Sequence, residues 1–408
     1  MNRKSLPTLC LVAFFTTISW AQTETILWNF SDSSGDGKAP WSNFLISDSK
    51  GNLYGATNQG GTNSTGMVFE LSPDSSGGYT ETILYDFNVY GSGDGSGPYG
   101  SLAFNQSGDL IGTTSGGGAS GAGTVYRLTP KSGGGWTEKI IYSFSMSGGD
   151  GQYPAAGVAI GKNGALYGTT AFGGTNSSGA VYKLSETAKG LTEKVIHSFG
   201  GSGDGSYPYG GLTFDSLGNL YGTTSIGGAV GYGSVYRLKP TKSGWTETLL
   251  HSFTDQKGDG SGMYYVNIVS DAAGNLYGAT AFGGANATGI VWELVYSKTM
   301  NKYSEKILYT FGATGSGDGN YPYGGVVMGK PGTLFGTTED GGTSNDGIVY
   351  RLQKSGSQWT KTILHNFSGG TDGQDPSANL LRDVHGNLFG MAQYGGTSND
   401  GIVYKVKP

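Results

Sequence analysis

Seven aspartates, each followed by glycine, recur through the chain and are the first residues whose type and spacing could do chemistry. They are Asp36, Asp94, Asp150, Asp204, Asp259, Asp318 and Asp372. Aromatic residues follow several of them closely, namely Trp41, Tyr99, Tyr209, Tyr323 and, in a slightly shifted copy, Tyr265. Carboxylates beside aromatic rings can bind sugars, by stacking and by hydrogen bonds to hydroxyls, or can bind a cation. The competing interpretation is that Asp-Gly only forms a turn, which every copy needs.

Calcium is the cation that the loop pattern resembles most. Residues 32–37 and 255–260 match the first half of a calcium-binding loop. The twelfth positions hold Asn43 and Val266, where such a loop needs a glutamate that binds through both oxygens. The sequence therefore predicts no cofactor, with calcium as a weakly supported alternative.

Catalytic residues are harder to find. Three of the four histidines, His197, His251 and His365, occupy a strand position that holds Trp or Tyr in other copies, which indicates that their side chains pack in the fold. The spacing of the histidines does not match a metal site. Glycoside hydrolysis needs two inequivalent carboxylates about 5–10 Å apart. The acids here repeat nearly identically, and the clearest departures are Glu339-Asp340 and the insertion at residues 259–264. We therefore predict no catalytic residue and no metal ligand.

Composition restricts the fold class and the partners. The 408 residues include 77 Gly, 26 Tyr, 17 Phe and 7 Trp, and only 13% are charged. Many aromatic residues between many turns are typical of an all-β protein. The net charge is −5 and no basic cluster is present, so nucleic acid and anionic membranes are poor partners.

The first 21 residues have the pattern of a signal peptide. Arg3 and Lys4 precede a short apolar run at residues 9–18, and Ala21 ends a small-x-small cleavage site. The run is too short to span a bilayer. The only cysteine, Cys10, lies inside it. We expect an exported monomer, secreted or periplasmic, with no visible anchor segment.

An internal repeat predicts the architecture. A Leu-Tyr-Gly segment and its variants recur with steps of 54 to 58 residues, and the glycines are Gly55, Gly112, Gly168, Gly222, Gly278, Gly336 and Gly390. Each copy reads as four short strands, and seven such copies are typical of a seven-bladed β-propeller over residues 22–408. The repeat starts with an outer strand at residues 22–30 and ends with inner strands at 377–406, so the two ends complete one blade and close the ring.

The strand order also predicts one shared face. In a four-stranded meander, the loops between blades and the Gly-Gly loops within blades lie at the same end. We expect the seven Asp-Gly turns there, around the axis. The glycine in the second strand of each blade predicts the close approach of a neighbouring backbone or aromatic ring.

Three linked motifs carry a family resemblance. Residues 204–208 read Asp-Gly-Ser-Tyr-Pro, residues 218–224 read Gly-Asn-Leu-Tyr-Gly-Thr-Thr, and residues 341–352 carry Gly-Gly followed by Gly-Ile-Val-Tyr-Arg-Leu. This order resembles the GloVer tandem-repeat family of exported bacterial proteins over residues 22–408. The resemblance implies export and display at the cell surface, and it implies no known reaction.

The preferred function is therefore a non-catalytic extracytoplasmic binding or scaffold module. Its ligand would be a polysaccharide or a surface protein, bound at the Asp-Gly face. The first alternative is a carbohydrate-active hydrolase or lyase that uses the axial depression. The second is a purely structural surface repeat.

Overall fold

The computed structural model describes residues 24–31, 35–41, 44–187, 190–256, 258–315 and 317–408. Within these residues the chain forms β-strands and no helix. The described part therefore contains no helix with the length and apolarity to cross a bilayer. The expected signal peptide at residues 1–21 lies outside the described residues.

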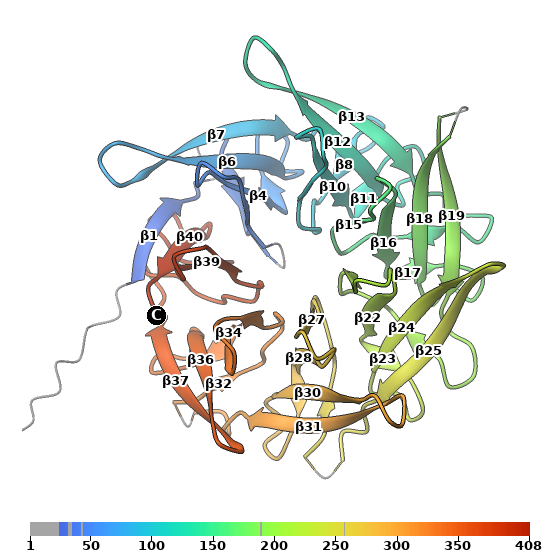
Figure 1. Cartoon of the computed structure of the whole chain (residues 1–408). Helices are drawn as coiled ribbons and strands as arrows, with labels where there is room; N and C mark the ends of the chain where they lie inside the picture. Colours follow the sequence, from blue (N-terminus) through green and yellow to red (C-terminus); the bar gives the residue numbers. More distant parts are fainter. Residues whose placement is uncertain (1–23, 32–34, 42–43, 188–189, 257, 316) are drawn as a thin grey trace, which may run out of the picture.

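Seven antiparallel sheets of four strands surround a central axis (Figure 1), which confirms the predicted propeller. The innermost strands are β3 (Ile46–Ser47), β9 (Ala103–Phe104), β15 (Ala159–Ile160), β21 (Thr213–Phe214), β27 (Val269–Ser270), β33 (Val327–Met328) and β38 (Leu381–Arg382). The second strands are β4 (Leu53–Thr57), β10 (Leu110–Thr114), β16 (Leu166–Thr170), β22 (Leu220–Thr224), β28 (Leu276–Thr280), β34 (Thr333–Thr338) and β39 (Leu388–Ala392).

The outer half of each blade is longer. The third strands are β6 (Met67–Pro73), β12 (Thr124–Pro130), β18 (Ala180–Thr187), β24 (Ser234–Thr241), β30 (Ile290–Ser297), β36 (Ile348–Ser355) and β40 (Ile402–Val406). The outermost strands are β7 (Tyr79–Asp86), β13 (Trp136–Ser143), β19 (Gly190–Ser198), β25 (Gly244–Ser252), β31 (Lys302–Thr310), β37 (Gln358–Asn366) and β1 (Glu24–Asn29).

Short two-stranded ribbons link the loops of one face. Each pairs the residues after an Asp-Gly aspartate with a Gly-Gly loop: β2 (Gly37–Lys38) with β5 (Gln59–Gly60), β8 (Gly95–Ser96) with β11 (Gly116–Gly117), β14 (Gly151–Gln152) with β17 (Phe172–Gly173), β20 (Gly205–Ser206) with β23 (Ile226–Gly227), β26 (Gly260–Ser261) with β29 (Phe282–Gly283), and β32 (Gly319–Asn320) with β35 (Asp340–Gly341). In the seventh blade a bridge between Gln374 and Tyr394 takes this place. The predicted common face of the two loop series is therefore present, and we call it the loop face.

The ring closes through the first described strand. β1 pairs antiparallel with β40, from Glu24 opposite Val406 to Asn29 opposite Ile402. Figure 1 shows the blue strand β1 beside the red strand β40. The seventh sheet therefore contains both ends of the described chain, as the repeat phase predicts.

Each outermost strand contains a β-bulge. Val68 pairs with Tyr85, whereas the next residue, Phe69, pairs with Ile83, so Leu84 is the extra residue. Leu84 is buried, and Ile83 is 44% exposed. A bulge re-aims the side chains that follow it. It therefore turns the aromatic or histidine side chain two residues after the Ile83 position towards the loop face.

Aromatic side chains explain the recurring glycine of the second strand. A Cβ atom added to Gly112 would overlap the ring of Tyr126, which is fully buried in the neighbouring strand. The other copies meet a ring at the same place, and these rings belong to Phe69, Tyr182, Tyr236, Trp292, Tyr350 and Tyr404. The sequence prediction of close ring packing is confirmed.

The core lies between the blades. Among the described residues, seven apolar clusters each join two neighbouring blades. The cluster at the ring closure contains Phe30, Phe69 and Val403. Pro40 packs on Gly401, where an added Cβ would lie 2.6 Å from the proline Cδ and where φ is +102°. The proline of the repeat motif therefore fits against a glycine of the preceding blade.

Candidate functional site

The aspartates of the Asp-Gly turns bind the outermost strands. Asp94 accepts hydrogen bonds from the Gly95 and Asn88 amides, at 2.7 and 2.9 Å, and from the Tyr85 hydroxyl at 2.8 Å. The same outer-strand donor recurs as Trp28, Tyr142 and Tyr309, and as the imidazoles of His197 and His365. Because the outermost strands form the rim of the ring, the aspartate side chains are engaged there and not around the axis.

Packing explains the glycine that follows the aspartate in the second copy. Gly95 does not take a positive φ, and an added Cβ would lie 2.6 Å from Cγ2 of Thr114 in the second strand. Close packing against this threonine therefore requires the glycine. Asp94 closes the loop through its hydrogen bonds, which is the geometry of a turn-forming role.

A glutamate from the next blade faces most of these aspartates. Burial, together with the charge of Asp94, raises the pKa of Glu138 to about 7. Glu193 is raised to about 7 in the same way beside Asp150, and burial plus Asp36 raises the pKa of Glu81 to about 9. In six blades one glutamate oxygen is buried without a hydrogen-bond partner among the described residues: Glu24, Glu81, Glu138, Glu193, Glu247 and Glu305. These carboxyl groups are therefore poorly solvated acids at the blade contacts.

One blade replaces this glutamate by lysine. Lys361 forms an ion pair with Asp318, and its side chain is only 9% exposed. Its ammonium group also lies 5.5 Å from the centre of the Tyr309 ring. At this contact the chain itself places a cation beside the aspartate.

The predicted aromatic residues, in contrast, do come together. The ring of Trp41 lies 6.0 Å from those of Tyr99 and Tyr265, and Tyr209 lies 5.8 Å from Tyr265. Tyr264 continues the series to Tyr323 at 5.9 Å. Trp41, Tyr99, Tyr209, Tyr265 and Tyr323 therefore belong to one connected set of rings, which we call the aromatic network.

Tyr265 occupies the centre of this network. It touches the rings of Trp41 in the first blade and Tyr209 in the fourth, and Asn379 of the seventh blade donates a hydrogen bond to its carbonyl at 3.1 Å. Burial raises its pKa. A cavity lined by Tyr99, Tyr209 and Tyr265, among others, has a volume of only about 10 Å³, so the rings leave little open space between them.

Residues that the sequence missed extend the network. Phe172 in β17 lies 5.4 Å from Tyr207 and 5.7 Å from Tyr153, and it is 37% exposed. Phe282 in β29 lies 5.5 Å from Tyr321. A periodic aromatic residue before the Gly-Gly pair or before the loop proline is the signal that could have found them. The exposed large apolar residues of the loop face are Val89, Tyr90, Met146, Phe172, Ile226, Val230 and Tyr232.

Acidic residues break the repeat at one side of the network. Burial, with the charges of Asp375 and Asp340, raises the pKa of Glu339 to about 7. Burial and the charge of Asp340 raise the pKa of Asp375 to about 6. The sequence indicated Glu339-Asp340 but not Asp375. Asp375 stands before the loop proline, where other copies have tyrosine or alanine, and this difference is visible only when the loops are aligned on that proline. Glu339 and Asp340 also act electrostatically on Tyr323.

Several grooves open on the opposite face, between neighbouring blades. One of about 510 Å³ is lined by Tyr167, Phe214 and Trp245, and one of about 410 Å³ includes His385. The sequence did not indicate them, because each combines residues from turns of different repeats.

The candidate calcium loops fall partly outside the described residues. Asp255, in the second loop, accepts a hydrogen bond from Ser261 at 3.0 Å.

Comparisons with known proteins agree with the fold. The chain matches the Gloeobacter/Verrucomicrobia repeat family over residues 12–139, 134–311 and 294–408. No curated protein sequence matches it. A solved structure described as a candidate 6-phosphogluconolactonase from Bacteroides uniformis is 13% identical, covers 85% of this chain and 96% of its own, and has a TM-score of 0.52. A candidate oxidoreductase (glucose dehydrogenase) from Thermus thermophilus is 14% identical, covers 95% of this chain and 100% of its own, and has a TM-score of 0.43. At these identities the likeness concerns the fold alone.

Proposed function

We propose, from the premise that this chain belongs to the Gloeobacter/Verrucomicrobia repeat family, that it is a non-catalytic binding module for a glycan. The glycan binds at the loop face, over the aromatic network. The signal-peptide pattern at residues 1–21 supports export of the protein, as a monomer, to the periplasm or the medium. The carrying observation is the convergence of aromatic rings from separate blades on one face.

Aromatic side chains suit a sugar for two reasons. Their faces stack on the apolar C–H surface of a pyranose ring, and tyrosine hydroxyls add hydrogen bonds at the edge. Phe172 is partly exposed and is surrounded by the rings of Tyr153, Tyr207 and Tyr209. An extended glycan can contact several such rings in succession, because neighbouring ring centres are 5.4 to 6.4 Å apart. The seven rim aspartates contribute turn geometry to this face rather than ligand contacts.

A second candidate function rests on the acids that break the repeat. Glycoside hydrolysis needs one protonated and one ionised carboxyl group. Burial raises the pKa of Glu339 to about 7 and that of Asp375 to about 6, so either carboxyl group can keep its proton close to neutral pH. Glu339→Gln should abolish any release of sugar from dye-labelled polysaccharides if this alternative holds, whereas glycan binding without release supports the non-catalytic module.

A glycan array with the purified chain, with and without calcium, tests the proposal. We expect binding that falls roughly fivefold or more in Tyr209→Ala/Tyr323→Ala, because stacking contributes about 0.5–1.5 kcal/mol for each ring. Asp204→Asn should change affinity little, since its partners are Gly205 and His197 within the turn and outer strand. The matched control is His385→Ala on the opposite face.

Two outcomes would contradict the proposal. Affinity that survives the double tyrosine change but falls in His385→Ala would assign binding to the opposite face. An array without any bound glycan, together with an Asp204→Asn change that affects only stability, would favour a purely structural repeat.

A further inference from the structure

The contacts between blades repeat one polar arrangement at the rim. It consists of the outer-strand side chain of one blade, the aspartate of the following loop, and the charged residue that faces this aspartate from the next blade's outer strand. We call this set a rim cluster. In three blades the outer-strand side chain is a histidine, so the cluster combines an imidazole nitrogen with two carboxylates.

Two of these clusters bring three potential metal ligands together. In one, Nε2 of His251 lies 3.7 Å from Oε1 of Glu305 and 3.9 Å from Oδ1 of Asp259. In the other, Nε2 of His365 lies 3.1 Å from Oδ1 of Asp372, with Glu24 beside them. In each cluster the three ligand atoms lie within 4.8 Å of one another.

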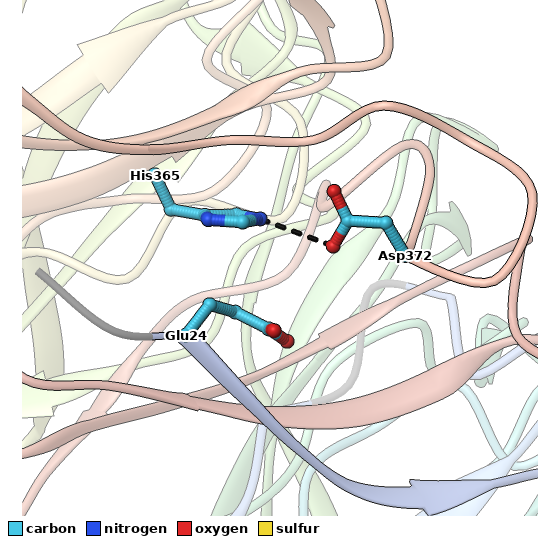
Figure 2. A group of neighbouring side chains, drawn as sticks. All are labelled: Glu24, His365 and Asp372. Atoms are coloured by element: carbon cyan, nitrogen blue, oxygen red, sulfur yellow. Dashed lines mark hydrogen bonds and ion pairs between the residues drawn. The ribbon is translucent and has the colours of Figure 1, made fainter.

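Figure 2 shows the second cluster. The imidazole of His365 and the carboxylate of Asp372 face each other, and the carboxylate of Glu24 points into the space below them. The three side chains come from β37, from the loop that follows it, and from β1. The cluster therefore connects the sixth blade to the strand that closes the ring.

Polar atoms in both clusters lack partners. Nε2 of His251 and one oxygen each of Glu305 and Glu24 are buried and have no hydrogen-bond partner among the described residues. The contrast with the tyrosine blades concerns the His251 atom, because Tyr85 and Tyr142 donate to Asp94 and Asp150 at 2.8 and 2.9 Å. The glutamates at those two contacts, Glu138 and Glu193, have an unpartnered oxygen as well. A buried polar atom without a partner is destabilising, and a cation bound in each cluster would give these atoms a partner.

Among the described residues, the one rim cluster without a glutamate, at the contact between the fifth and sixth blades, supplies an independent observation. There the glutamate is replaced by Lys361, which forms an ion pair with Asp318. The chain has therefore placed a positive charge where the other copies place a second carboxylate. This position in the rim cluster accommodates a cation in close contact with the aspartate.

We propose that the clusters Glu24–His365–Asp372 and His251–Asp259–Glu305 bind a divalent transition metal ion of the Zn²⁺ type. Imidazole nitrogen with carboxylate oxygen is a ligand set for Zn²⁺, at about 2.0–2.2 Å from the ion, whereas Ca²⁺ and Mg²⁺ take oxygen ligands. The separations of 3.1 to 3.9 Å between imidazole nitrogen and carboxylate oxygen are close to the roughly 3.3–3.6 Å between two ligand atoms of a tetrahedral ion. Each ion would bridge two blades, and water would complete its coordination.

Zn²⁺ titration of the full purified chain by calorimetry tests this proposal. We expect two equivalents of Zn²⁺ and a rise in melting temperature that EDTA reverses, since a ligand of the native state stabilises it by mass action. His251→Tyr and His365→Tyr should each remove one equivalent. Tyrosine fills this position in three other blades, so the melting temperature without metal should be retained.

The matched control is His197→Tyr, in the third histidine blade. His197 contacts Asp204 at 3.2 Å, but its cluster is not among the two whose three ligand atoms converge. Two equivalents in the parent and in the control, one in each single variant and none in His251→Tyr/His365→Tyr would support the proposal. A parent that binds no Zn²⁺, or a double variant that titrates like the parent, would overturn it.

Discussion

Phe30 offers a quantitative test of the ring closure. It follows the closing strand β1, is fully buried, and packs edge-on against Phe69 at 5.2 Å between ring centres. Its amide donates to the carbonyl of Gly401 at 3.0 Å. Phe87 has the same environment inside the ring, with Tyr126 at 5.2 Å and the Gly66 carbonyl at 3.1 Å. The two residues differ only in that the strand before Phe30 begins the described chain.

The expected cost follows from burial. Replacing a fully buried phenylalanine by alanine costs about 3–5 kcal/mol, through lost transfer free energy and the cavity that remains. Domain stabilities are about 5–15 kcal/mol, so either change should remove a large part of the free energy of unfolding. If β1 is held as firmly as the internal outer strands, Phe30→Ala and Phe87→Ala should be equally destabilising within about 1 kcal/mol.

Urea unfolding followed by tryptophan fluorescence measures both variants against the parent. The free energy of unfolding should depend on urea concentration with the same slope in both variants, and the two urea midpoints should be lowered equally. This result would show that the blade closed by β1 is as stable as a blade made of one continuous segment. A Phe30→Ala cost below about 1 kcal/mol, with Phe87→Ala at full cost, would refute the reasoning. It would mean that the closing strand is already detached under the conditions of the assay.

Two further predictions concern glycine and glutamate. Gly168→Ala should destabilise the fold by roughly 1–3 kcal/mol in the same urea assay, because the new Cβ overlaps the Tyr182 ring, and an unchanged midpoint would contradict this packing. Stability should fall from pH 5 to pH 7.5, because Glu138 and Glu193 have folded-state pKa values of about 7, so the folded chain keeps protons that the unfolded chain loses near pH 4.5. Glu138→Gln/Glu193→Gln should flatten this slope, and a parent whose urea midpoint rises over the same range would contradict it.

The blade count and the ring closure could be predicted because both follow from repeat phase. A glycine recurs every 54 to 58 residues, which gives the number of blades. The outer strand at residues 22–30 lacks inner strands before it, so it can complete only the last blade. The packing reason for Gly112 and its copies was also predictable, since glycine is otherwise unfavourable inside a strand. The family prediction is confirmed by the match over nearly the whole chain.

The candidate site was only partly predictable. The rings of Trp41, Tyr99 and Tyr265 converge as expected, because their loops share one face. The aspartates were expected around the axis, but the β-bulge in each outer strand turns a Tyr, Trp or His side chain towards them and holds them at the rim. A bulge changes the face of the residues that follow it, and strand periodicity alone does not reveal its position. The histidine clusters were missed for the same reason.

The pairing of β1 with β40 has a consequence for the order of events during synthesis. The first described strand, β1, is completed by a strand made about 380 residues later. At about 5–20 residues per second, that partner arrives roughly 20–80 s afterwards. During this interval β1 lacks its pairing with β40, and Ile26 lacks its cluster partners, which include Phe367 and Val406. A chain interrupted at any point before β40 therefore keeps β1 unpaired, which distinguishes an unfinished ring from a finished one.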